Sequence, residues 1–515
     1  MAAPDCRTRA THIISLRRLA PLLALAAVLV PASNFAAAGE LLAGIGKIEI
    51  TDREAGPVND PLYVKTLVLR SNSTTAVIIT LDAVAIGEIG PVSNNYLPTV
   101  RARLQQDLGI PETHILVNAS HCHGIVCSDV DARTIRSVEM ALNNLVPVRI
   151  GRGIGNETRI MENRRLKLKS GKTADVRHAY SLPPDDELVE VGKTDPQIGI
   201  LRVDRLDGHP LAIVYNFACH PIQGVPGGGN TADIIGYSSQ VIEENLGPGT
   251  LALFLQGCGG DINPANYKSV DEPRSAEPLG NMLGLSVLRA ARQIECGDDD
   301  RLQIINETIQ LPRVDSSARI FAMEAEQRSL LESLNGTSLN FKTFMTLSLK
   351  HGLSPDFPSS PAHRYMHEQL LGRSDLRNLD SENRRNLNAY LKNILTMEEL
   401  TRVQTNLALL RKHHASLIAS GKRTIAAELM ALRIGDFVLT TFPGELTVDV
   451  GLKIKMRSPQ QPTFIAGYTN GYLYYCPTPE QMENQGNAQE DSDCLLAPEW
   501  HPLYEEKVLD LLGRL

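Results

Sequence analysis

The chain is poor in aromatic residues and in positive charge, and it lacks three motifs that mark common classes of binding protein. Only 5% of its 515 residues are aromatic, with a single tryptophan, so no aromatic surface for grasping lipid stands out. Its formal net charge of -8 argues against a general nucleic-acid-binding protein, because phosphate contacts need concentrated Lys and Arg. No CxxC pair supports a structural zinc finger, no Gly-Lys-Ser/Thr completes a P-loop, and no GxGxxG opens a helix after the first strand. Zinc-finger, P-loop and dinucleotide-binding proteins are therefore disfavoured.

The first residues have the pattern of an export signal. A positive flank ends at Arg17 and Arg18, an apolar run follows over 19–30, and the small residues Ala36-Ala37-Ala38 offer a cleavage site before Gly39. The apolar run is shorter than the roughly 20 residues of a membrane-spanning helix. We therefore predict a signal peptide over 1–38 and an exported chain, periplasmic or extracellular, over 39–515. An uncleaved membrane anchor is the alternative.

The cysteines leave the disulfide pattern open. Of the eight, Cys6 lies in the export signal and an odd number follow it. Export permits disulfides, and Cys476 with Cys494 could close a loop. The spacing does not decide the pairing.

Strand and helix patterns alternate along most of the chain. Apolar runs rich in β-branched residues predict strands, and helical periodicity bounded by Gly or Pro predicts the helices between them. The strands are expected at 44–50, 67–70, 75–82, 115–118, 211–217 and 251–256, and the helices at 97–108, 131–145, 233–246 and 276–294. This alternation predicts an α/β fold with a layered mixed sheet and flanking helices.

The pattern changes between about 316 and 420. Leu, Met and charged residues recur there at helical spacing, which predicts a helical insertion broken at Pro355, Pro358 and Pro361. Strands resume over 424–441 around a Gly435-Asp436 hairpin turn, and a final helix is expected over 499–512. A length of 515 residues suits one large α/β domain with such an insertion.

Residues that commonly bind metal follow three apolar strands. They are His121 and His123 after 115–117, His220 after 211–215, and Glu445 after 437–441. Loops at strand ends collect catalytic groups, and two His with a Glu suit a catalytic zinc that keeps one position for water. Each residue alone has an ordinary alternative, a structural His or a solvated Glu, so the hypothesis depends on their combination.

Two local arrangements suggest roles near the metal. In an extended segment His121 and His123 point the same way, with Cys122 opposite, so one can bind metal while the other contacts substrate or water. The loop Gly257-Cys258-Gly259-Gly260-Asp261 lets the backbone approach a ligand, and its amides could stabilise an oxyanion. A tight strand-to-loop turn is the alternative for that loop.

Taken together, these motifs resemble the neutral/alkaline non-lysosomal ceramidase family over most of the chain from about residue 41. The matching segments are the opening strand 44–51, Asn163-Arg164-Arg165, His121-Cys122-His123-Gly124, Asn216-Phe217-Ala218-Cys219-His220-Pro221, Gly260-Asp261-Ile262-Asn263-Pro264, Pro443-Gly444-Glu445 and the tyrosine segment 470–480. The family's loop serine is Asn263 here, so a serine nucleophile is excluded at that position. No counterpart of the family's C-terminal immunoglobulin-like domain is expected after the tyrosine segment.

The resemblance implies a zinc amidase. It makes four residues the zinc ligands, namely His121, His220, Glu445 and Tyr475. We expect catalytic roles for His123, Asp261 and Asn263, and substrate contacts from Arg164, Gly259, Gly260 and Tyr472.

We therefore predict an exported zinc-dependent amide hydrolase that acts on a small-molecule or lipid amide, N-acyl and ceramide-like by the resemblance. A metal-dependent hydrolase of another bond, such as an ester, and a non-catalytic binding protein on the same fold are the alternatives. No nucleic-acid partner is expected, peripheral membrane contact stays open, and the sequence does not set the oligomeric state.

Overall fold

The structure is a computed structural model that describes residues 40–176, 182–224, 229–267, 269, 271, 274–483 and 488–515. The predicted export signal over 1–38 lies outside the described residues. The segment Gly39–Leu515 forms one unit, which is the unit described below. Within the described residues, no helix is both long enough and apolar enough to cross a membrane.

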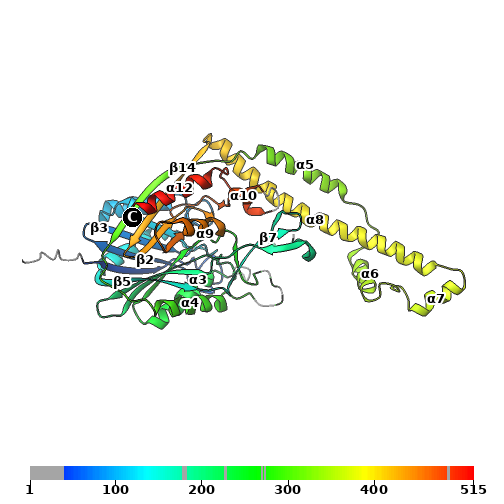
Figure 1. Ribbon diagram of the computed structural model, residues 1–515, viewed down its shortest axis with the longest axis horizontal. Helices are drawn as coiled ribbons and strands as arrows, with labels where there is room; N and C mark the ends of the chain where they lie inside the picture. The colour runs from blue at the N-terminus through cyan, green and yellow to red at the C-terminus, as the bar shows by residue number, and fades with distance from the viewer. Residues whose placement is uncertain are drawn as a thin grey trace, which may run out of the picture. The chain divides into compact units, whose positions relative to one another are not determined.

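A mixed eight-stranded sheet organises the first half of the chain (Figure 1). Its strand order is β12-β11-β10-β5-β1-β2-β3-β4, with β3–β4 and β11–β12 parallel and the other pairs antiparallel. The strands are β1 (Leu42–Glu49), β2 (Tyr63–Ser71), β3 (Thr74–Leu81), β4 (Ile115–Ala119), β5 (Val146–Asn156), β10 (Gln197–Arg205), β11 (Pro210–Phe217) and β12 (Leu251–Gln256). Strands β2, β3 and β11 are buried along almost their whole length because both faces of the sheet are covered there.

A second, four-stranded sheet packs against one face of the first. Its order is β14-β15-β16-β18, formed by β14 (Leu302–Pro312), β15 (Thr424–Ile434), β16 (Phe437–Thr441) and β18 (Thr463–Ala466). One apolar core joins the two sheets, with Leu67 and Leu253 from the first and Leu432 and Phe464 from the second. The hairpin turn predicted at Gly435-Asp436 is confirmed, since Ile434 pairs with Phe437.

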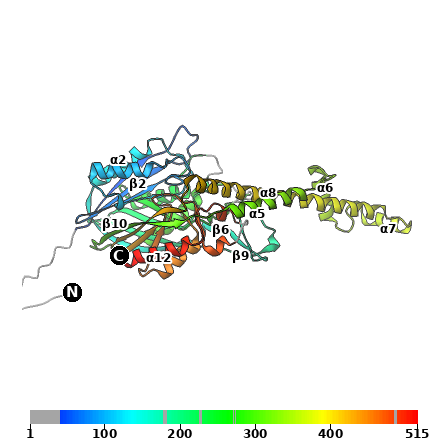
Figure 2. The ribbon, with the colours of Figure 1, turned by 90° about the horizontal axis from the view of Figure 1, so that it is seen from above.

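Helices cover the outer faces of both sheets, as Figures 1 and 2 show. The first sheet carries α1 (Tyr96–Leu108), α2 (Val130–Asn143), α3 (Asp233–Leu246) and α4 (Glu277–Ala291), and the second carries α9 (Val448–Arg457) and α12 (Trp500–Gly513). The layers are therefore helix, sheet, sheet and helix, which confirms the predicted α/β fold with a layered mixed sheet. The remaining elements are β6 (Met161–Asn163), β7 (Arg165–Leu168), β8 (Thr173–Asp175), β9 (Leu188–Val191), β13 (Ile262–Pro264), β17 (Glu445–Leu446), β19 (Tyr475–Cys476), α10 (Pro479–Met482) and α11 (Gln489–Ser492).

The segment predicted to be helical contains four helices, α5 (Ser317–Ser333), α6 (Phe341–Leu353), α7 (Ala362–Leu370) and α8 (Asp375–Ser420). The predicted proline break falls between α6 and α7, and two further breaks, over 334–340 and 371–374, were not predicted. The 46-residue α8 runs beside α5, with α6 and α7 along its N-terminal half (Figures 1 and 2).

The seven cysteines that follow the export signal are free thiols. Cys476 and Cys494 are both buried, and the thiol of Cys476 contacts the Tyr474 carbonyl. Cys476 and Cys494 therefore do not form the disulfide that the sequence allowed.

Candidate metal centre

Two buried asparagines bring the strand ends of both sheets together. The Asn118 side chain, on β4, donates to the Gly467 carbonyl at 2.7 Å and accepts the Gln256 amide at 2.9 Å. The Asn216 side chain, on β11, donates to the carbonyls of Leu255 and Ile465 at 2.9 and 3.0 Å. These bonds join β4, β11 and β12 to the end of β18, which runs parallel to β16, so the chain that follows each of these strands enters the same region.

His121 lies just beyond β4 and points its Nε2 atom into this region. Its backbone has φ 67°, a left-handed conformation, and not the extended one that the sequence predicted. The centroids of the His121 and His123 rings nevertheless lie 5.5 Å apart, and Cys122 is buried in the core. The two histidines are therefore grouped as predicted, but with a left-handed residue at His121 in place of an extended strand. Non-glycine residues rarely adopt this conformation, and here the His121 amide is bonded to the Ala83 carbonyl at 3.0 Å.

Both candidate histidines are held in the same tautomer. The His121 Nδ1 atom lies 2.6 Å from the Val84 carbonyl oxygen, and the His220 Nδ1 atom lies 3.0 Å from the Ile262 carbonyl oxygen. A carbonyl only accepts, so each Nδ1 carries the proton and each Nε2 keeps a lone pair. Burial lowers the pKa of His121 to about 4 and, together with the charge of Arg164, lowers the pKa of His220, which keeps both rings neutral.

Glu445 completes the group from the second sheet. Its Oε2 atom lies 3.6 Å from His121 Nε2 and 3.2 Å from His220 Nε2, and the side chain is 1% exposed. The carboxylate accepts hydrogen bonds from the hydroxyls of Tyr468 and Tyr472.

These three ligand atoms fit a divalent cation. The atoms of His121, His220 and Glu445 lie within 4.8 Å of one another, and all three residues are buried. Two imidazole lone pairs and a carboxylate oxygen converge with no proton donated among them, an arrangement that a cation stabilises. Carbonyl acceptors on the outer nitrogens are the usual support for metal-binding histidines.

Tyr475 lies at the edge of this group. Its hydroxyl is 3.5 Å from His220 Nε2 and accepts a hydrogen bond from Arg164 Nη2 at 3.1 Å. The position suits a fourth ligand, as the family resemblance implies.

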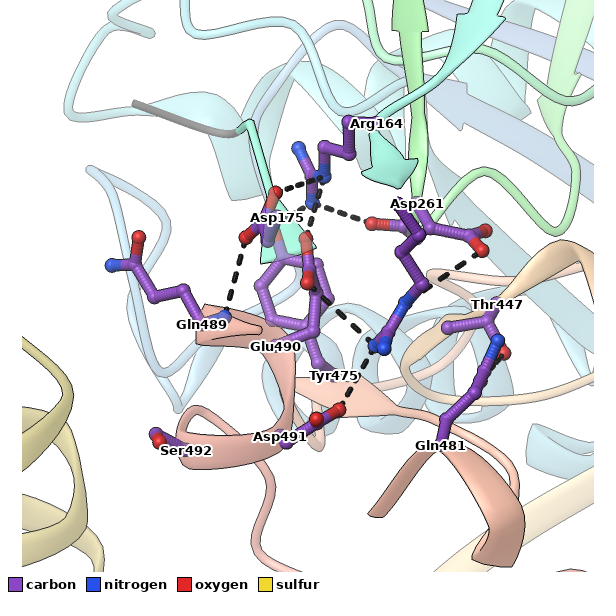
Figure 3. Close-up of polar contacts among 12 residues, drawn as sticks. Arg164, Asp175, Asp261, Thr447, Tyr475, Gln481, Gln489, Glu490, Asp491 and Ser492 are labelled. Carbon is purple, nitrogen blue, oxygen red and sulfur yellow. Dashed lines mark hydrogen bonds and ion pairs between the residues drawn. The ribbon is translucent and has the colours of Figure 1, made fainter. Parts of the chain in front are cut away.

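A buried charge network supports Tyr475 from behind (Figure 3). The Arg164 guanidinium, 1% exposed, donates to the Glu490 carboxylate at 2.6 Å, the Gly260 carbonyl at 2.5 Å and Asn263 at 3.1 Å. Arg165 pairs with Asp491 at 3.0 Å. Figure 3 shows that Glu490 and Asp491 come from the short helix α11, with Arg164 across from it. The network fixes the guanidinium, and through it the orientation of the Tyr475 hydroxyl.

The group opens onto a cavity of about 300 Å³. The ligand residues, His123, Arg164, Tyr472 and Tyr475 line it, and the helical insertion contributes Leu409 and Lys412 of α8. The end of α8 is fixed there by His413, whose Nε2 lies 2.8 Å from the Asp493 carboxylate. One wall of the cavity is therefore made by a segment for which the sequence indicated no role.

Three of the other predicted site residues lie in supporting positions. The Asp261 carboxylate accepts the Val448 amide at 2.8 Å and faces Arg165, and it is not among the described residues that line the cavity. Asn263 accepts from Arg164 at 3.1 Å, and Gly260 contacts the backbone of the Glu445 strand. The hydrogen bonds therefore place Asp261 and Asn263 behind the ligands.

The predicted oxyanion amides are already occupied. The Gly259 amide donates to the Gly257 carbonyl and the Gly260 amide to the Leu446 carbonyl, both at 2.9 Å. A Cβ on Gly260 would lie 2.7 Å from the Glu445 carbonyl oxygen. The oxyanion interpretation is therefore wrong for these two amides, and the alternative, a tight turn, is correct because glycine allows the loop to pack against the Glu445 strand.

Sequence reasoning missed Tyr468. Its buried hydroxyl donates to Glu445 Oε2 at 3.1 Å, and its ring centroid lies 4.4 Å from that of His121. No local signal marks it, because a tyrosine after an apolar strand is ordinary in a core.

Neither a protein-family model nor a curated protein sequence matches the chain. Solved structures that are similar to it include two ceramidases. One is a neutral ceramidase from Pseudomonas aeruginosa, with 16% sequence identity and a TM-score of 0.58 over 93% of this chain and 75% of that one. The other is a ceramidase complexed with C2, with the same identity and TM-score over 92% of this chain and 75% of that one. The chain therefore has a ceramidase-like fold, as the motifs predicted.

Proposed function

We propose that the chain is an exported, zinc-dependent amide hydrolase that acts on an N-acyl, ceramide-like substrate. The observation that carries the proposal is the convergence of His121 Nε2, His220 Nε2 and the Glu445 carboxylate, all buried, at the inner end of a cavity. His121, His220 and Glu445 would hold the metal, with Tyr475 as the fourth ligand. The ceramidase-like fold supports an amide as the scissile bond.

Zinc in this site would supply Lewis acidity toward the amide carbonyl and a water of lowered pKa. Hydrolysis breaks the amide C–N bond, so the acyl carbon gains the water oxygen and the leaving nitrogen gains a proton. A histidine binds zinc through a neutral imidazole and a carboxyl binds it as the carboxylate, and the fixed tautomers of His121 and His220 meet that need without rearrangement.

His123 is the residue we assign to proton transfer. It lines the cavity beside His121 without belonging to the ligand group, and histidine is the side chain that most often transfers protons in catalysis. It would give the proton to the departing amine nitrogen. Arg164 would orient the Tyr475 hydroxyl, and Tyr472 would hold the Glu445 carboxylate through its hydroxyl.

The first test is the zinc content of the purified protein beside the His220→Ala and Glu445→Ala variants. We expect about one zinc per chain in the wild type and its loss in both variants. His209→Ala is the matched control, because that side chain is 79% exposed on a turn and should not affect zinc content.

A second assay separates the candidate reactions. The zinc-loaded protein is given an amide and an ester with the same acyl chain, with and without a chelator. Cleavage of the amide that the chelator abolishes supports the proposal. Cleavage of the ester alone would favour the esterase alternative, and a folded protein that takes up no zinc would favour a binding protein.

A further inference from the structure

Helix α6 exposes a line of large apolar side chains. Phe341, Met345, Leu349 and Leu353 recur every four residues and are 66, 52, 64 and 77% exposed. Residues spaced by four lie on one side of a helix, so these side chains form a continuous apolar strip. Single exposed leucines are normal on proteins, but a strip of this kind marks a binding surface.

The opposite side of α6 is also apolar. Phe344 stacks on Tyr390 of α8 with ring centroids 4.4 Å apart, and Leu347 is half-buried beside it. A surface helix normally turns polar residues outward once its apolar side is packed. The packing of α6 on α8 explains the apolar side that carries Phe344. It does not explain the exposed apolar strip on the other side of α6.

The apolar exposure continues through α7. Met366, Leu370 and Leu371 are 61, 84 and 59% exposed. We define the α6–α7 apolar surface as Phe341, Met345, Leu349, Leu353, Met366, Leu370 and Leu371. Seven such side chains lie within about 30 residues, whereas the described exposed apolar residues on the body of the protein lie singly, apart from a smaller group of four around β9, namely Leu182, Leu188, Val189 and Val191.

The charge of this region differs from that of the rest of the chain. Residues 341–392 contain eight Lys and Arg against five Asp and Glu, a net +3, whereas the whole chain carries -8. Helix α6 has no acidic residue, and Lys342 and Lys350 lie within it. Lysines beside an apolar strip are the pattern of helices that lie in the surface of anionic membranes.

We propose that the α6–α7 apolar surface binds an anionic lipid bilayer, with the apolar strip in the interface and the lysines at the headgroups. Helix α8 connects this surface to the cavity, because its C-terminal end supplies Leu409 and Lys412 to the cavity wall. Membrane binding would thus hold the proposed lipid hydrolase at the layer where its substrate resides. The binding itself depends on this surface alone and stands apart from the proposed amide chemistry.

Vesicle flotation tests the proposal without any catalytic readout. Protein lacking residues 1–38, so that the apolar run of the predicted signal contributes nothing, is mixed with phosphatidylcholine vesicles with or without phosphatidylglycerol. We expect it to float with the anionic vesicles. The triple variant Phe341→Gln, Met345→Gln, Leu349→Gln should bind at least about 1000-fold more weakly, since each large apolar side chain buried contributes roughly tenfold or more.

Two further variants sharpen the result. Lys342→Gln with Lys350→Gln should weaken binding to anionic vesicles by about fivefold per lysine and leave binding to neutral vesicles unchanged. Leu206→Gln with Met456→Gln is the matched control, because those residues are 54 and 76% exposed on the body of the protein, and it should float like the wild type.

Three results would overturn the proposal. They are wild-type protein that does not float, a triple variant that floats as well as the wild type, and a dimer in light scattering that the triple variant converts to a monomer without any vesicle binding. The last result would assign the surface to a second copy of the chain.

Discussion

Replacing Gly260 by alanine tests how closely the glycine-rich loop packs against the strand that bears Glu445. The new Cβ would lie 2.7 Å from the Glu445 carbonyl oxygen and 2.9 Å from that of Leu446, where ordinary contact begins at 3.4 Å. Both neighbours are backbone, so no side chain can rotate away. The strand must move by about 0.7 Å, the difference between 3.4 and 2.7 Å, or the loop must retreat.

The expected loss follows from these distances. Overpacking of this kind costs about 1–3 kcal/mol. The move also strains the bond from the Gly260 amide to the Leu446 carbonyl, 2.9 Å in the native protein, which is worth about 1 kcal/mol. We therefore expect the free energy of unfolding to fall by roughly 2–4 kcal/mol. Because the strand carries a ligand, zinc affinity should fall about 10- to 100-fold.

Urea unfolding of the metal-free protein and competition with a zinc-binding dye measure the two effects. Gly297→Ala is the control, because nothing lies within 4 Å of the position that its Cβ would take, and its stability should stay within about 0.5 kcal/mol of the wild type. If Gly260→Ala unfolds and binds zinc as the wild type does, the close packing of the glycine-rich loop against the strand that bears Glu445 is refuted.

Three other substitutions address the buried charges and the fourth ligand. Arg164→Met should lower the free energy of unfolding by about 3–5 kcal/mol, because it leaves the Glu490 carboxylate buried without its 2.6 Å partner, and the further change Glu490→Gln should restore part of the loss in urea unfolding. Lys65→Met should lower the free energy of unfolding at pH 7 by roughly 1–3 kcal/mol, because the Lys65 amine is the main charge that offsets the buried Asp82 carboxylate, whose pKa burial raises. The substitution raises the pKa of the Asp82 carboxyl further, and the penalty of ionising that carboxyl is full above its folded-state pKa and gone below the unfolded value of 3.8, so the loss should shrink as unfolding is repeated at lower pH, and a loss independent of pH would contradict this cause. Tyr475→Phe should weaken zinc binding about 10-fold or more with little loss of helix content, and unchanged dye competition would remove Tyr475 from the ligand set.

The helical insertion gains a role only from the structure. Its sequence matched no motif, yet α8 lines the cavity with Leu409 and Lys412 and is held there by the His413–Asp493 pair. His413 and Asp493 are 80 residues apart in the chain. No periodicity in either segment indicates such a contact, because each residue is ordinary in its own helix or loop.

The sequence alone determined the elements and the metal-type residues. Apolar runs and helical periodicity are local properties, so β4, β11, β12 and the helices that follow them were predicted within a few residues. His121, His220 and Glu445 could be named because each follows a predicted strand, where chain geometry favours open loops, whereas Tyr475 was named from the family resemblance.

The tertiary structure alone decided how those residues meet. The Asn118 and Asn216 side chains bring strand ends together, the Gly260 amide bonds to Leu446 where an oxyanion role was predicted, and Tyr468 holds Glu445. Each of these contacts joins segments far apart in the chain. A local pattern reports how a segment folds, whereas the partner of a buried polar atom depends on which distant segment packs against it.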